Sequence, residues 1–198
     1  MYSTLQRLNH YGSISTTFVM VLLGLISLAS FFTLPVIEPG SVSVNDVIIR
    51  RGRINHWGGP TEEIASMRFD MRTDLTQLLN SYNTKQLFIY LTAAYVDDVS
   101  GDTHEVVLWD RIITRGSIRD FRSTGDAVAR KNRSHRAKIR MDDVKNKYVW
   151  RNPSRSFKNI HNANITLSYH LMPYVGLVTS GVAATARGMV EIPDLVKK

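Results

Sequence analysis

The sequence predicts an all-β domain, an antiparallel β-sandwich, joined to one N-terminal transmembrane helix. Three observations lead to this prediction. Residues 11–37 carry no formal charge, which is typical of a membrane-spanning segment. The remaining chain contains several short segments of alternating apolar and polar residues, separated by turn residues. Helical periodicity is scarce outside the first segment, so we expect the strands to pair in antiparallel sheets.

The apolar segment lies close to the N-terminus. As a helix, residues 11–37 would reach roughly 40 Å, which exceeds the ~30 Å hydrocarbon core of a bilayer. A cleavable signal peptide is the alternative, with Ser27-Leu28-Ala29 as its cleavage site. Apolar residues continue past this site to Leu34, so we interpret the segment as a retained signal-anchor helix. The chain is then divided into a cytosolic tail (1–10), a transmembrane helix (11–37) and a folded domain (38–198).

The orientation of this helix is not decided by basic residues, because they occur on both sides of it. A short N-terminal tail before a long domain favours a type II orientation, with the domain in the lumen. Two glycosylation sequons, at Asn132 and Asn164, would fit a lumenal domain. Two such triplets are also expected by chance in a chain of this composition.

Strands are predicted in order along the domain. Residues 41–50 alternate and then become apolar, and residues 65–71 alternate strictly, which indicates a strand with one buried face. Residues 73–83 read as a turn or short helix that Thr73 or Asp74 could cap. Residues 85–96 are apolar on both faces, so we expect a central strand covered on both sides.

The second half of the domain continues the pattern. A turn at 97–102 joins the central strand to a partner strand at 106–114. Three later segments complete the prediction: a short strand at 147–150, an alternating strand at 164–172 and a final strand within 187–196.

A basic segment, residues 115–140, carries nine Lys or Arg side chains against two Asp. We expect a solvated surface loop, although anionic lipid headgroups or nucleic acid could also attract such a segment. Aromatic residues do not alternate with the basic ones, which argues against a platform for single-stranded nucleic acid. We therefore expect no nucleic-acid partner.

Catalytic and metal-binding patterns do not stand out in the sequence. The chain has no cysteine, no HExxH motif, no Asp-x-Asp clamp and no glycine pattern of a nucleophile elbow. No cofactor or metal is therefore expected. The histidines that follow the helix are interpreted as surface residues: His56, His104, His135, His161 and His170.

Five aromatic residues are candidates for the core of the sandwich or for an interface with a partner. Aromatic residues on alternating strands are mostly core, but they also dominate buried contact patches between proteins. The five are Tyr90, Tyr95, Trp109, Trp150 and Tyr169.

Four blocks of sequence resemble a known family. They are residues 69–95 (FDMRTDLTQLLNSYNTKQLFIYLTAAY), 106–113 (VVLWDRII), 147–150 (KYVW) and 167–181 (LSYHLMPYVGLVTSG). In order and spacing they are similar to subunit 3 of the eukaryotic signal peptidase complex. Two departures are the segment Asn80-Ser81-Tyr82-Asn83, where the family has Asn-Trp-Asn, and a longer basic segment.

The resemblance implies a type II, single-pass glycoprotein of the endoplasmic reticulum membrane, with a sequon near Asn164. It also implies a non-catalytic role, because the family's catalytic serine and histidine belong to another subunit. The implied partners are the catalytic and accessory subunits, in a hetero-oligomer, together with membrane lipid. The alternatives are a membrane-tethered adhesion or receptor-like sandwich and, less well supported, a basic domain facing the cytosol.

Overall fold

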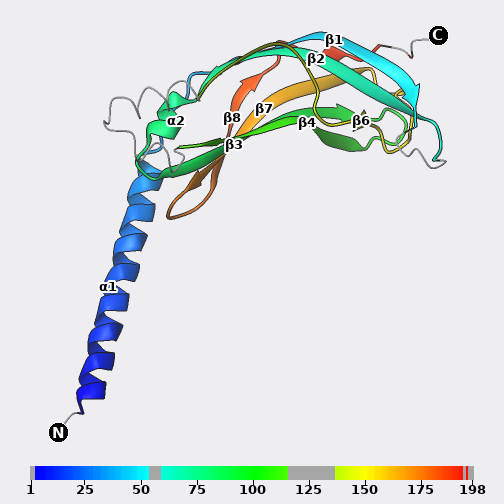
Figure 1. Cartoon of the computed structure of the whole chain (residues 1–198). Helices are drawn as coiled ribbons and strands as arrows, with labels where there is room; N and C mark the ends of the chain where they lie inside the picture. The colour runs from blue at the N-terminus through cyan, green and yellow to red at the C-terminus, as the bar shows by residue number, and fades with distance from the viewer. Residues whose placement is uncertain (1–2, 54–58, 116–136, 194, 196–198) are drawn as a thin grey trace.

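The computed structural model describes residues 3–53, 59–115, 137–193 and 195. Helix α1 (Thr4–Phe32) projects from one end of a domain built from two antiparallel sheets (Figure 1). The two sheets share one hydrophobic core, and no residue of α1 is buried. The predicted fold class, two antiparallel sheets behind an apolar N-terminal helix, is therefore confirmed.

Helix α1 is long and apolar enough to cross a membrane. It begins at a capping box, in which the Ser3 hydroxyl accepts from the Gln6 amide (3.4 Å) and the Gln6 side chain accepts from the Ser3 amide (3.2 Å). The helix therefore starts before the uncharged segment does. It ends at Phe32 rather than Ile37, because Pro35 disfavours helical geometry at the residue before it.

The first sheet has the order β1-β2-β5, and β6 also pairs with β2. Its strands are β1 (Ser41–Gly52), β2 (Glu62–Asp74), β5 (Lys138–Lys145) and β6 (Trp150–Arg151). The alternation predicted for 65–71 is confirmed in β2, since Ala65, Met67, Phe69 and Met71 are all completely buried.

The second sheet has the order β4-β3-β7-β8, and β9 pairs with β7. Its strands are β3 (Thr84–Val96), β4 (Thr103–Thr114), β7 (Asn162–Pro173), β8 (Thr179–Thr185) and β9 (Val190–Glu191). The short helix α2 (Thr76–Asn80) leads from the first sheet to the second. It has Leu75 as its N-cap, and the Asp74 carboxylate accepts from the Thr76 amide at 2.9 Å.

Several strand predictions need correction, and the first concerns the central strand. Strand β3 is central, but the middle of its outer face is not covered: Leu87, Ile89 and Leu91 are buried, while Phe88 and Tyr90 are half-exposed. A two-layer sandwich has no third layer to cover the outer face of a central strand.

The other corrections concern four strands in the second half of the domain: β5, β6, β8 and β9. Strand β8 was not predicted, because Ala and Gly residues replace the large apolar residues that mark a strand. Among the described residues of 187–196 only the two-residue β9 forms, and of the predicted strand at 147–150 only Trp150 belongs to a strand, β6. The end of the expected basic loop belongs to β5, and residues 116–136 lie outside the described part of the chain.

Candidate interaction surfaces

The outer face of the second sheet carries an aromatic patch, which we define as Phe88, Tyr90, Ile112 and His170. Phe88 lies between Ile112 on β4 and His170 on β7 in the strand register, so the three side chains share one face. Tyr90 follows two residues later on the same face. Ile112 is 57% exposed. The patch is therefore an apolar surface open to a partner.

Ring stacking holds the aromatic patch together. The His170 ring stacks on Tyr90 (centroids 5.2 Å apart) and on Phe88 (6.3 Å), and Phe88 stacks on Tyr90 (5.4 Å). The Tyr90 hydroxyl lies 3.1 Å from His170 Nε2. These contacts restrict the side-chain rotamers before any partner binds, which lowers the entropy cost of forming an interface.

Asp110 lies beside the patch, opposite Tyr90 in the register. Its carboxylate accepts hydrogen bonds from the Lys147 ammonium and from the Tyr148 hydroxyl (2.9 Å). The bond from Lys147, followed by that from Tyr148, lowers the pKa of Asp110 below its ordinary value. These bonds fix the segment between β5 and β6 at the margin of the patch, where Tyr148 and Val149 add exposed apolar surface.

The five aromatic residues singled out in the sequence lie in different places. Tyr95, Trp109 and Trp150 are buried, and burial raises the pKa of the Tyr95 hydroxyl. Tyr169 is half-buried and packs toward the core, and its burial also raises its pKa. Tyr90 is the one member of the five on the outer face.

Sequence reasoning missed Phe88, Ile112 and His170 as members of this surface. The available signal was that residues 85–96 are apolar at both alternating sets of positions. In a two-layer sandwich one of those sets must face outward, and Phe88 and Tyr90 belong to it.

The sequon residue Asn164 is exposed on β7, opposite Ala94 of β3. It projects from the same outer face as Tyr90, nearer the other end of the strands. A glycan on Asn164 would therefore border the patch without covering it. Asn132 lies outside the described residues.

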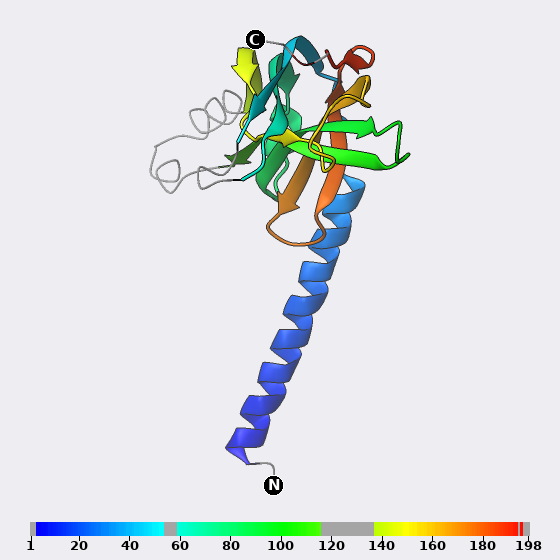
Figure 2. The same ribbon diagram turned by 90° about the vertical axis from the view of Figure 1, so that its right-hand side faces the viewer.

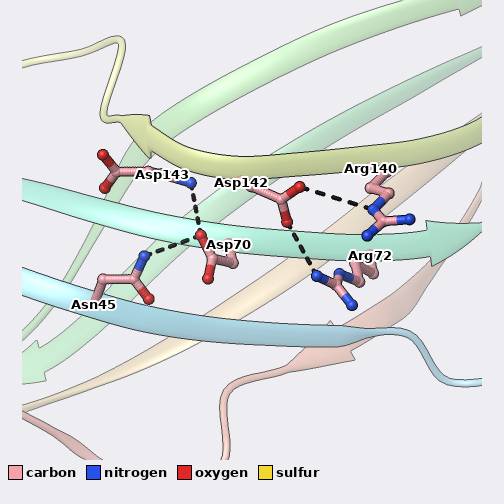
Figure 3. A network of polar contacts seen from close by, with 6 residues as sticks. All are labelled: Asn45, Asp70, Arg72, Arg140, Asp142 and Asp143. Atoms are coloured by element: carbon pink, nitrogen blue, oxygen red, sulfur yellow. Dashed lines mark hydrogen bonds and ion pairs between the residues drawn. The ribbon is translucent and has the colours of Figure 1, made fainter.

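The outer face of the first sheet is polar instead (Figure 3). The Asp70 carboxylate accepts from the Asn45 side chain (2.9 Å) and from the Asp143 amide (2.6 Å). Asp142 pairs with Arg72 (3.2 Å) and Arg140 (3.7 Å). The outer face of the first sheet is thus polar and solvent-exposed, and the outer face of the second sheet carries the aromatic patch.

The histidines within the described chain have different surroundings. His161 lies 3.5 Å from an Asp98 carboxylate oxygen, and His170 belongs to the aromatic patch rather than to a polar surface. No described histidine is hydrogen-bonded to a serine hydroxyl, and the described residues contain no group of three potential metal ligands. His56 and His135 lie outside the described residues.

The model of one protein family, described as "Signal peptidase subunit", matches residues 1–194. The chain belongs to the signal peptidase subunit family. The match includes α1, so the helix of this signal peptidase subunit is part of the family's pattern and fits a membrane anchor of the endoplasmic reticulum. The resemblance seen in the sequence is confirmed.

Individual relatives agree with the family match. This signal peptidase subunit is 26% identical to "Signal peptidase complex subunit 3" of Yarrowia lipolytica, over 99% of this chain and 100% of the relative. It is 29% identical to the Saccharomyces cerevisiae protein of the same name, over 91% of each chain. The human protein of that name is 27% identical over 78% of this chain and 73% of its own.

Proposed function

We propose that this chain is a non-catalytic subunit of the endoplasmic reticulum signal peptidase complex. Its sandwich domain would hold the catalytic subunit at a set height above the membrane while signal peptides are removed from translocated chains. The observation that carries the proposal is the family match across residues 1–194. Catalysis benefits from such placement, since a displacement of about 1 Å can cost roughly 100-fold in rate.

The position of the aromatic patch supports this role. The second sheet forms the layer of the sandwich on the side from which α1 departs (Figure 1). A protein bound to the outer face of that sheet would lie between the sandwich and the bilayer. The proposed partners are therefore the catalytic and accessory subunits, in a hetero-oligomer, and neither a cofactor nor nucleic acid is part of the proposal.

The first test asks whether the patch binds the catalytic subunit. Ile112→Glu places a charge at the exposed edge of the patch, and Val99→Glu is the control, because Val99 is 78% exposed in the turn between β3 and β4. Loss of an interface hot spot costs about 2 kcal/mol or more, roughly 30-fold in affinity. We expect the first variant to lose the catalytic subunit during purification in mild detergent and the control to retain it.

Retention of the catalytic subunit by both variants would contradict the role of the patch. If no signal peptidase subunit co-purifies with the unaltered chain, the adhesion-like alternative gains support instead. The non-catalytic assignment has its own check: single serine-to-alanine and histidine-to-alanine variants should keep signal peptide cleavage near normal. A serine variant that abolishes cleavage while the complex stays intact would overturn it.

The proposed orientation is type II, with residues 1–10 in the cytosol and residues 38–198 in the lumen. Asn164 is exposed, so its sequon would be accessible for glycosylation if the domain lies in the lumen. Glycosidase treatment should shift the mobility of the unaltered protein, and the shift should shrink in Asn164→Gln. Protease digestion of the domain in sealed microsomes would contradict this orientation.

A further inference from the structure

The loop between β7 and β8 is unusually apolar for an exposed turn. No charged residue occurs between His170 and Arg187. At the tip of the loop, Tyr174, Leu177 and Val178 are exposed, and Leu177 is 79% exposed. Exposed turns are usually rich in Asn, Asp, Ser and other polar residues, and a continuous exposed apolar surface indicates an interaction site.

This loop lies against α1 rather than away from it. Figure 2 shows the loop in orange, descending beside the upper end of the helix, and Figure 1 agrees. Gly176 (φ +114°) packs so closely that a Cβ atom placed on it would lie 2.6 Å from the Ser27 hydroxyl oxygen. A cavity of about 260 Å³ between helix and loop is lined mainly by apolar residues, among them Leu28, Phe31, Leu34, Val175 and Leu177.

The contact at Ser27 sets the depth of the loop in the membrane. Ser27 lies within the apolar stretch 18–34 and five residues before Phe32, where the helix ends, which corresponds to roughly 8 Å along the axis. The helical part of the uncharged segment, residues 11–32, is roughly 33 Å long and matches the ~30 Å hydrocarbon core. Ser27 is therefore at the level of the acyl chains, and Gly176 is beside it.

We infer that the tip of the β7–β8 loop inserts into the same bilayer leaflet as the end of α1 and contacts lipid acyl chains. This inference rests on α1 being the membrane anchor, and it does not depend on the scaffolding role. The depth matches the ~5–10 Å to which interfacial apolar segments penetrate. Tyr174 suits this position, because aromatic residues are enriched at membrane interfaces.

The consequence of this insertion is a second point of attachment to the membrane. A single helix allows the domain to rotate about the helix axis and to change its tilt. A loop inserted next to the helix restricts both motions, so the aromatic patch keeps one direction relative to the membrane plane. Lipid is the favoured occupant because Gly176 lies beside Ser27, which is inside the apolar stretch of α1, and because residues 171–186 carry no charge that acyl chains would exclude.

The absence of cysteine permits a direct test with single labels. A fluorophore is attached to Leu177→Cys, to Val99→Cys as an equally exposed control, and to Phe18→Cys inside α1. The full chain is placed in phosphatidylcholine vesicles that contain a lipid with a nitroxide quencher on its acyl chain, and the intact complex is measured in the same lipids. We expect quenching at 177 to be at least about fivefold stronger than at 99, in both preparations.

Each outcome decides the inference. Strong quenching at 18 with equal, weak quenching at 177 and 99 overturns loop insertion while leaving the anchor intact. Quenching at 177 in the isolated chain but not in the complex also overturns it, because another subunit then covers the tip. Absent quenching at 18 overturns the anchor itself, and with it the inference.

Discussion

Asp70 joins three strands of the polar sheet through one carboxylate. It lies on β2 and accepts from Asn45 of β1 and from the backbone of Asp143 on β5. The strand register shifts at Asn45 in one pairing and at Asp70 in the other, and Asp143 has a φ of +54°. The Asp70 carboxylate therefore stabilises two β-bulges, one in the pairing of β1 with β2 and one in the pairing of β2 with β5.

We predict that Asp70 makes stability depend on pH. The hydrogen bond from the Asp143 amide, followed by that from Asn45, lowers the pKa of Asp70 in the folded state. A lowered pKa stabilises the fold above the carboxyl's ordinary pKa, and this stabilisation is lost as pH falls through the folded value. Asp70→Asn should therefore melt below the unaltered chain at neutral pH, and the gap should close in strong acid.

The measurement is the melting temperature of the full chain in detergent, followed by circular dichroism at a series of pH values from neutral to strongly acidic. Asp102→Asn is the control, because the Asp102 carboxylate has no partner within the described chain. A gap that stays constant with pH would show that the charge of Asp70 is not what stabilises the bulges.

At the scale of elements, the β7–β8 hairpin is held at its base by Asn83. The Asn83 side chain donates to the Val175 carbonyl (2.6 Å) and accepts from the Val175 amide (3.1 Å), and its carbonyl accepts from the Tyr174 amide (2.8 Å). Asn83 is buried. The hairpin therefore takes its direction from a residue on the connection between α2 and β3.

Removing this side chain should loosen the hairpin. Asn83→Ala removes the side-chain partners of the half-buried amide and carbonyl of Val175, and each hydrogen bond lost in this way costs about 0.5–1.5 kcal/mol. We expect faster hydrogen exchange in residues 173–178 and weaker insertion of the loop into vesicles. Asn80→Ala is the control, since Asn80 is exposed on α2. Equal exchange rates in the two variants would rule out Asn83 as the support.

In the whole molecule, α1 lies outside the core of the sandwich and contacts the domain at the β7–β8 loop. The core contains residues from Val42 to Ile192, and only Leu34 and Ile37 pack against it from the connection that follows the helix. The helix therefore positions the domain at the membrane and adds little to the stability of its core. The tip of the hairpin has three exposed apolar side chains. Their apolar surface is similar in extent to that of a single acyl chain, and one acyl chain alone binds a protein to membranes only weakly.

We therefore predict that residues 34–198 fold without the helix. This fragment should show the near-ultraviolet circular dichroism of packed aromatic residues and a melting temperature close to that of the full chain. It should remain largely in the supernatant when vesicles are sedimented, whereas the full chain should pellet. A fragment without tertiary packing would mean that α1 stabilises the sandwich after all.

Local sequence patterns were sufficient to predict several elements of the fold. The uncharged segment predicted α1, because a helix that crosses a bilayer must be apolar over the thickness of the hydrocarbon core. Strict alternation predicted β2, because successive side chains of a strand point to opposite faces. The turn residues at 97–102 predicted the β3–β4 hairpin. The blocks around Leu108 and Leu167 indicated the family that the match later confirmed.

Which surfaces face outward, and what they contact, depends on how the strands are ordered and connected in space. Phe88 and His170 are far apart in the chain, and the pairing of β3 with β7 brings them together on one face. Likewise, Gly176 and Ser27 meet because the hairpin runs back toward the helix. Such contacts depend on strand order and on the direction of each connection, which residues close in sequence do not encode. The aromatic patch and the inserted loop are products of that topology.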